Sequence, residues 1–251
     1  MTHVVFLIRV VTCATSIRRD ALREWSYRSP VDQSNLEGAA EHALRSAGVD
    51  GTSAVSMLMV ARRVLGSDAV RRVPASALPR GASATLSRLD GQVRIYLRRG
   101  LSPIEERFAI AHELGHHILD HHREERSPLL ELEADYVAAC LVIPHRALRD
   151  ARRELGDDIA GLAEVFQASQ TAVALRLGEA GALPAVIVVS PQLVRVRSLS
   201  EVSLPPESDI RRLATARIRD VRRVAGPGVR RARLTDDRQR VALLLDDEAV
   251  A

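Results

Sequence analysis

The chain has 251 residues, of which 46% are hydrophobic and 27% are charged. An apolar fraction of this size excludes wholesale disorder, and the length is sufficient for one large domain with small additions. All 36 basic residues are arginines and the formal net charge is only +4, so basicity alone is a weak argument for nucleic-acid binding. No stretch approaches the ~18 consecutive apolar residues of a membrane-spanning helix, and no basic stretch precedes the N-terminal apolar run. We therefore expect a cytoplasmic protein.

The first half of the chain contains one clear helix signal and one clear strand signal. Residues 1–50 carry no sharp motif, whereas residues 54–65 have helical apolar spacing that ends before Gly66. In residues 91–97, apolar side chains alternate with polar ones, which predicts a half-buried strand.

A strong helix start follows at Ser102. Ser102 can cap a helix whose first residue is Pro103, and Glu105 completes a capping box. This helix is expected to run to about residue 119. Further along the chain, helices are expected at 129–142, 158–166 and 171–180, and strands at 185–189 and 193–196. The residues from 205 onward remain unassigned.

The predicted helix at Ser102 contains the sequence His112-Glu113-Leu114-Gly115-His116, an H-E-x-x-H pattern. Residues four apart lie on one helix face, so both imidazoles can point at one ion. Zinc suits two neutral imidazoles and a carboxylate, with a fourth position left for water. Glu113 can then accept a proton from that water as a general base.

The third ligand is expected from the helix that follows. Glu131 and Asp135 are four apart, so Glu131 can complete the zinc site while Asp135 accepts the outer N–H of a ligand histidine. Glu133 is the competing ligand, but it points about 200° around the helix from Glu131. We prefer Glu131 because only Glu131 has a carboxylate partner at i+4.

The two motifs together resemble the ImmA/IrrE family of zinc-dependent peptidases. Its members share an R-F-x-x-A-H-E-x-x-H helix and a following E-x-x-A-[ND]-x-x-A-x-x-L-x-x-P helix. In the broader thermolysin-like group, the first glutamate of a similar second element binds zinc. The matching residues here are Arg107, Phe108, Ala111, His112, Glu113, His116, Glu131, Ala134, Asp135, Ala138, Leu141 and Pro144. Asp135 stands where the family more often has Asn, and Val137 where it often has Phe.

The resemblance covers roughly residues 50 to 180 and implies an α+β fold. The expected architecture is a zincin-like catalytic domain with a small edge sheet and active-site helices, followed by a helical hairpin and a small C-terminal α/β region. The corresponding segments are an unassigned N-terminal extension (1–50), the metallopeptidase core (51–150), a helix-turn-helix-like segment (151–183) and a C-terminal region of unknown fold (184–251).

Several residues near the motifs have two possible roles. His117, His121 and His122 are expected at the surface rather than in a second metal site. Tyr136 is expected as a partly buried core residue, with substrate oxyanion binding as the alternative. The segment 162–177 has the form of a helix-turn-helix, but its second helix offers few polar side chains for base edges, so we favour a packed helical hairpin over DNA binding.

The function predicted is that of a zinc-dependent endopeptidase with Glu113 as the general base. The resemblance implies that the substrate is a regulatory protein, often a helix-turn-helix repressor, in stress response or mobile-element control. The alternative is a non-proteolytic DNA- or protein-binding regulator with a structural zinc site. Glu113 argues against that alternative, because a structural site needs no base. A membrane-embedded peptidase is disfavoured by the lack of spanning segments.

Overall fold

The computed structural model describes residues 33–50, 54–89, 91–121, 127–180, 185–189, 194–198, 229–234 and 241–245. These residues divide into two compact units. The first comprises the residues up to Ala151 together with Val165–Ala168, and the second comprises the rest. Within the described residues, no helix combines the length and the apolar character needed to cross a bilayer.

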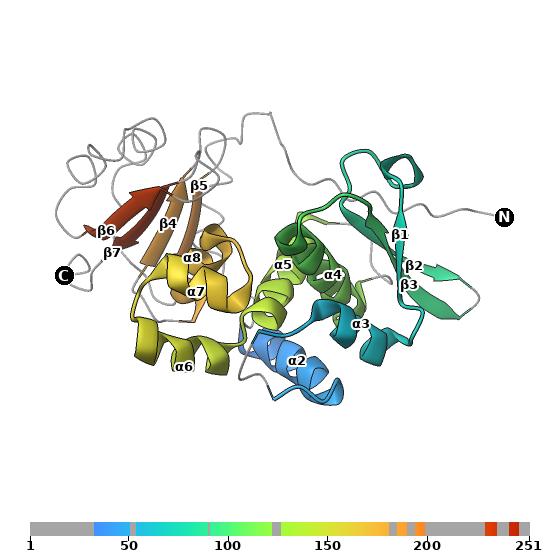
Figure 1. Cartoon of the computed structure of the whole chain (residues 1–251), viewed down its shortest axis with the longest axis horizontal. Helices are drawn as coiled ribbons and strands as arrows, with labels where there is room; N and C mark the ends of the chain where they lie inside the picture. The colour runs from blue at the N-terminus through green and yellow to red at the C-terminus, as the bar shows by residue number, and fades with distance from the viewer. Residues whose placement is uncertain are drawn as a thin grey trace. The chain divides into compact units, whose positions relative to one another are not determined.

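The first unit combines helices with a small sheet, as expected for an α+β fold (Figure 1). The helices α4 and α5 lie side by side in its centre and share an extensive interface. The elements of this unit are α2 (Gln33–Ser46), α3 (Met57–Leu65), β1 (Val70–Val73), the 3-10 turn η1 (Ala75–Ala77), β2 (Ala84–Leu89), β3 (Gln92–Arg98), α4 (Pro103–Ile118), α5 (Pro128–Val142) and most of α6 (His145–Leu155).

The three-stranded sheet has the order β1-β3-β2, with β1 parallel and β2 antiparallel to the central strand β3. The predicted strand is confirmed as β3, in which Ile95 and Leu97 are fully buried. These side chains belong to the core, and α4 lies against both β2 and β3. The sheet therefore supports α4 from one side while α5 packs on it from another.

Helix α2 was not predicted and packs against α5. Its buried face consists of two leucines and two alanines at helical spacing, Leu36, Ala40, Ala43 and Leu44. Tyr136 of α5 is half-buried and donates a hydrogen bond to Glu37 of α2 over 3.3 Å. Tyr136 is therefore a packing residue between two helices, as we expected.

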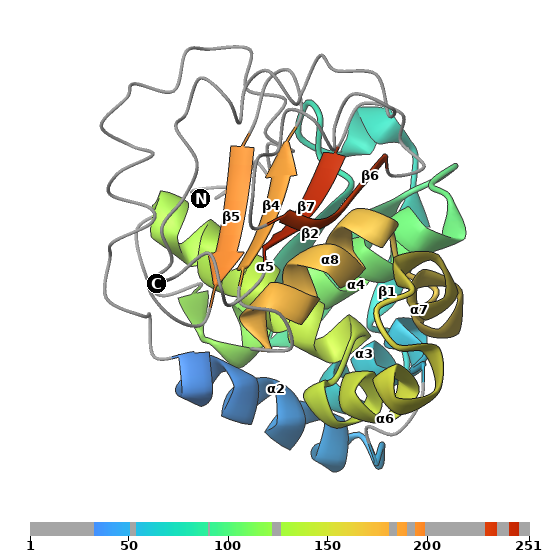
Figure 2. The same ribbon diagram turned by 90° about the vertical axis from the view of Figure 1, so that its left-hand side faces the viewer.

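The second unit contains a four-stranded antiparallel sheet of order β5-β4-β7-β6. The predicted strands are confirmed as β4 and β5, whereas β6 and β7 fall in the region that the sequence left unassigned. Helix α8 packs on β4 and β5 (Figure 2). The elements beyond α6 are α7 (Ile159–Phe166), α8 (Gln170–Glu179), β4 (Ala185–Val189), β5 (Val194–Ser198), β6 (Val229–Leu234) and β7 (Val241–Leu245).

The second helix of the helix-turn-helix-like segment is α8. Its polar side chains Gln170, Thr171 and Arg176, the candidates for base contacts, are all buried. A recognition helix must present such side chains at the protein surface to reach base edges. In this structure α8 does not do so, which agrees with a packed helix.

Candidate metal centre

Helix α4 presents its two motif histidines on one face because its start is fixed by local chemistry. The hydroxyl of Ser102 accepts the backbone N–H of Glu105 over 3.3 Å, and the Glu105 carboxylate accepts the backbone N–H of Ser102 over 2.8 Å. The predicted capping box is therefore confirmed, with Pro103 at the first helical position. His112 and His116 then follow one turn apart in the last half of the helix.

Helix α5 begins with an equivalent signal, since Ser127 caps it and Pro128 opens it. This start places Glu131 in the first turn and Asp135 one turn later on the same face. The two helices approach closely at Gly115 of α4, where an added Cβ would lie 2.8 Å from the carbonyl oxygen of Ala134. The absence of a side chain at Gly115 thus lets the carboxylates of α5 reach the histidines of α4.

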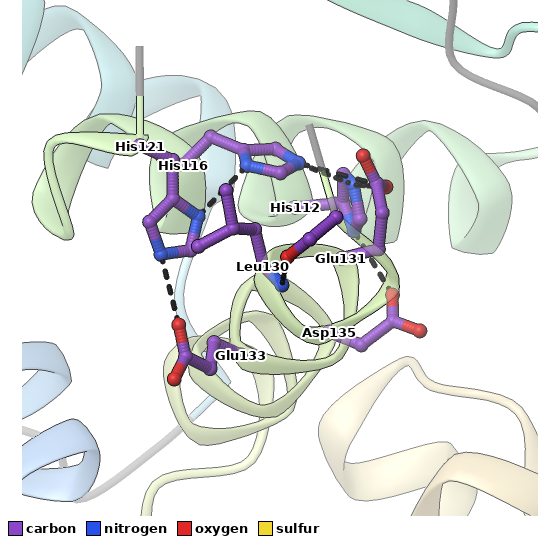
Figure 3. A network of polar contacts seen from close by, with 8 residues as sticks. His112, His116, His121, Leu130, Glu131, Glu133 and Asp135 are labelled. Atoms are coloured by element: carbon purple, nitrogen blue, oxygen red, sulfur yellow. Dashed lines mark hydrogen bonds and ion pairs between the residues drawn. The ribbon is translucent and has the colours of Figure 1, made fainter. Parts of the chain in front are cut away.

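The structure brings His112, His116 and Glu131 together (Figure 3). The Nε2 atoms of the two histidines are 3.1 Å apart, and Oε2 of Glu131 lies 3.4 Å from Nε2 of His112 and 3.7 Å from Nε2 of His116. Ligand atoms at about 2.0–2.1 Å from a tetrahedral zinc lie roughly 3.3–3.4 Å from one another. The three atoms therefore match one face of a zinc coordination tetrahedron, which leaves its fourth corner for another ligand.

The outer nitrogen of His112 has a carboxylate partner. Nδ1 of His112 donates to Oδ1 of Asp135 over 2.9 Å (Figure 3). Because an ionised carboxylate only accepts, this bond places the proton of neutral His112 on Nδ1. The lone pair of Nε2 then points to the side of the ring where Nε2 of His116 and Oε2 of Glu131 lie. Asp135 thus occupies the position that we expected for it.

Glu133, the competing third ligand, lies elsewhere. Its Oε2 is 3.2 Å from Nε2 of His121, and Nδ1 of His121 is 3.0 Å from Nδ1 of His116 (Figure 3). The structure therefore brings Glu131, and not Glu133, to the motif histidines.

The prediction that His121 lies at the surface is wrong, since only 6% of this residue is exposed. Continued helix would turn His121 about 140° away from His116, so helical spacing gave no reason to pair them. Helix α4 instead ends at Ile118, and Asp120 adopts a left-handed conformation with φ of 58°. His117 is half-buried, and His122 lies outside the described residues.

Glu113 follows His112 on α4 and is almost completely buried, with 2% exposed. The backbone of Leu86 in the edge strand β2 hydrogen-bonds its carboxylate. Burial raises the pKa of Glu113, because desolvation disfavours the charged carboxylate, while the neighbouring histidines act in the opposite direction. A carboxylate with a raised pKa beside a group of residues that could hold a metal ion is suited to accept and return a proton.

The charges of the cluster stabilise one another. Burial by itself lowers the pKa of His112, but hydrogen bonds to Asp135 and Glu131 outweigh it and raise the pKa to about 10. Burial likewise opposes ionisation of Glu131, yet its bonds to His112 and His116 hold the pKa of this carboxyl far below its usual range. The pocket thus stabilises a carboxylate opposite positive charge, which is the arrangement that a divalent cation would also require.

Comparison with known proteins agrees with this geometry. The model of the IrrE N-terminal-like domain, peptidase family M78, matches residues 75–178, which include all of α4 and α5. The fold and the two motif helices are those of a metallopeptidase-type domain. Residues 75–178 therefore resemble the IrrE N-terminal-like domain, which supports the resemblance to the ImmA/IrrE family.

A solved structure described as a Mycobacterium tuberculosis transcriptional regulator is similar in fold, with a TM-score of 0.50 and 18% sequence identity. The similarity covers 66% of this chain and 56% of that structure, so the chain spans little more than half of its length. No curated protein matches the chain by sequence.

Proposed function

We propose that the protein is a zinc-dependent endopeptidase with Glu113 as its general base. The observation that carries the proposal is the three-atom cluster of His112, His116 and Glu131, with spacings that fit tetrahedral zinc, beside the buried carboxylate of Glu113. A structural metal site needs no buried acid next to it, because it performs no proton transfer.

In this proposal, Nε2 of His112, Nε2 of His116 and Oε2 of Glu131 hold the ion. Zinc, when bound, supplies Lewis-acid polarisation of the scissile carbonyl and lowers the pKa of the attacking water. Asp135 keeps the His112 ring in its metal-binding tautomer. Glu113 takes the proton from the water and passes it to the leaving amine, and its raised pKa favours holding that proton between the two transfers.

The proposed substrate is a repressor-type transcriptional regulator, which the ImmA/IrrE resemblance implies, and the proposed location is the cytoplasm. Expected settings are stress response and mobile-element control. The similar fold of a protein described as a transcriptional regulator supports a regulatory setting. It equally supports the alternative, a regulator that binds DNA or protein and uses zinc only structurally.

Replacement of Glu113 by Gln tests the enzyme against this alternative. Glu113→Gln preserves shape and does not touch the three-atom cluster, so we expect zinc content to stay near one ion per chain. Cleavage of the partner regulator should fall by at least ~10²-fold, because general-base catalysis contributes that much. The measurement is zinc content together with the appearance of regulator fragments over time.

The control is Glu164→Gln, the same substitution at an exposed residue of α7. It should cleave the regulator at the wild-type rate. If Glu113→Gln relieved repression of target genes as well as wild type, proteolysis would not be the mechanism, and the binding-regulator alternative would replace it.

A further inference from the structure

Buried His121 and half-buried Glu133 form a polar pair for which the proposed peptidase chemistry has no use. His121 is nearly inaccessible to solvent, and its two ring nitrogens lie within hydrogen-bonding distance of Glu133 and His116. Burial of an imidazole is costly unless its nitrogens are satisfied, so these bonds explain how the residue is accommodated. They also connect it to one of the motif histidines.

The left-handed turn at Asp120 produces this contact. Its φ of 58° departs from helical geometry immediately after α4, and His121 lies beside His116. Aspartate tolerates this conformation better than most non-glycine residues. The fold therefore contains an uncommon backbone conformation at the residue that positions His121.

The proton positions along these contacts follow from donor and acceptor chemistry. Glu133 can only accept, so Nε2 of His121 carries the proton of the neutral ring and its Nδ1 is an acceptor. The 3.0 Å contact between the two Nδ1 atoms then requires Nδ1 of His116 to be the donor. Nε2 of His116 is left with its lone pair directed toward Glu131 and His112, as metal binding requires.

We propose that Glu133 and His121 act as a positioning relay that fixes the metal-binding tautomer and orientation of His116. The relay rests on the metal site of the proposed function and extends it by two residues. Helix α5 then supplies an outer carboxylate to each motif histidine: Asp135 bonds His112 directly, and Glu133 acts on His116 through His121. Outer partners of this kind typically change metal affinity by about 10–100-fold when removed.

Zinc affinity of the full-length chain, measured by competition with a chromophoric chelator, tests the relay without any substrate. His121→Phe keeps a ring but removes both nitrogens, so affinity should fall by about 10–100-fold. His121→Gln keeps one acceptor and one donor, so it should lose less than about tenfold. His42→Gln, at an exposed histidine of α2, is the matched control and should bind as wild type does.

A double-variant comparison tests whether the two residues act in series. Glu133→Leu should weaken zinc binding, and adding it to His121→Phe should weaken binding no further, because the relay is already broken. Independent, additive losses would show that the two side chains affect the site separately and would overturn the relay.

A spectroscopic measurement on the wild-type chain avoids any dependence on variants that fold poorly. In long-range ¹H–¹⁵N correlation spectra of the zinc-loaded protein, His121 should have its proton on Nε2 and His116 on Nδ1. The opposite tautomer of His121 would overturn the relay.

Failure of the relay is distinguishable from failure of the proposed function. If wild type binds zinc more tightly than His112→Ala while His121→Phe equals wild type, only the relay is wrong. Should wild type bind zinc no better than His112→Ala, the relay fails together with the metal site. An equal loss of zinc affinity in His121→Gln and His121→Phe would show that His121 acts only through packing, and it would also overturn the relay.

Discussion

Three acidic residues alternate along the first turns of α5, and each has a different partner. Glu131 faces both motif histidines, Asp135 bonds the outer nitrogen of His112, and Glu133 bonds His121. Since successive side chains are separated by about 100° around a helix, residues 131 and 135 share a face that Glu133 cannot share. Their different environments follow from that rotation and from what lies opposite each face.

Glu131→Gln and Glu133→Gln are expected to have very different effects on metal binding. Glu131→Gln replaces an anionic ligand with a weak neutral one, so zinc affinity should fall by more than the ~100-fold typical of outer partners. In Glu133→Gln the amide oxygen can still accept from His121, so the loss should stay below about tenfold. Equilibrium dialysis of both variants against buffered zinc measures the difference, and the reverse order would mean that Glu133 is the ligand.

At the scale of elements, the site depends on how closely α4 and α5 approach. The two helices are in contact at Gly115, where an added Cβ would meet the backbone of Ala134 rather than a flexible side chain. Backbone atoms cannot rotate aside as the end of a side chain can, so the clash with an added Cβ is relieved only if the two helices move apart. Separation would move Glu131 and Asp135, which flank Ala134, away from the histidines.

Gly115→Ala should therefore weaken the metal site as well as the fold. We expect a loss of about 1–3 kcal/mol in the free energy of unfolding from overpacking, with a parallel loss of zinc affinity. Urea denaturation and chelator competition measure the two effects.

Gly38→Ala in α2 is the matched control, because nothing lies within 4 Å of its added Cβ. It should stabilise the protein by up to about 1 kcal/mol through helix propensity and leave zinc affinity unchanged. A Gly115→Ala variant with wild-type stability and affinity would show that the helices are free to shift without consequence.

At the scale of the whole molecule, Arg107 joins three parts of the first unit. Its guanidinium donates to the carbonyl of Val55, ahead of α3, and over 3.3 Å to the carbonyl of Val142, at the end of α5. Burial lowers the pKa of Arg107, which shows that desolvation of its charge opposes the hydrogen bonds.

Arg107→Met should lower the free energy of unfolding by about 2–4 kcal/mol, since hydrogen bonds from a charged donor contribute about 1.5–3 kcal/mol each and two carbonyls lose their partner. Arg72→Met is the control, because Arg72 forms an exposed ion pair with Glu106 and should cost less than about 1 kcal/mol. Comparable losses in the two variants, measured by urea denaturation, would contradict a bridging role for Arg107.

Metal binding should also stabilise the entire folded chain, because the cluster joins residues from two helices that are adjacent only in the native state. At free zinc about 100-fold above its dissociation constant, the gain should be about 2.7 kcal/mol. Differential scanning fluorimetry with and without zinc measures it as a rise in Tm. His112→Ala should show little of this rise, and an equal rise in that variant would place zinc elsewhere.

The local features of the site could be predicted from the sequence because they depend on neighbours in the chain. The capping box at Ser102 and the i, i+4 spacing of the motif histidines set the start of α4 and the shared histidine face. The alternation in residues 92–97 likewise identifies β3. Helix α2 was missed even though its buried residues Leu36, Ala40, Ala43 and Leu44 follow helical spacing, a signal that the sequence did offer.

The sequence by itself determined which residue types could bind a metal and which of them shared a helix face. Helical spacing also favoured Glu131 as the partner of the motif histidines. Only the tertiary structure decided that Glu133 lies at His121 and that His121 is buried against His116. Helical spacing cannot reveal these contacts, since they form across the α4–α5 interface and after the left-handed turn at Asp120. Pairing between distant segments depends on packing, which no local pattern encodes.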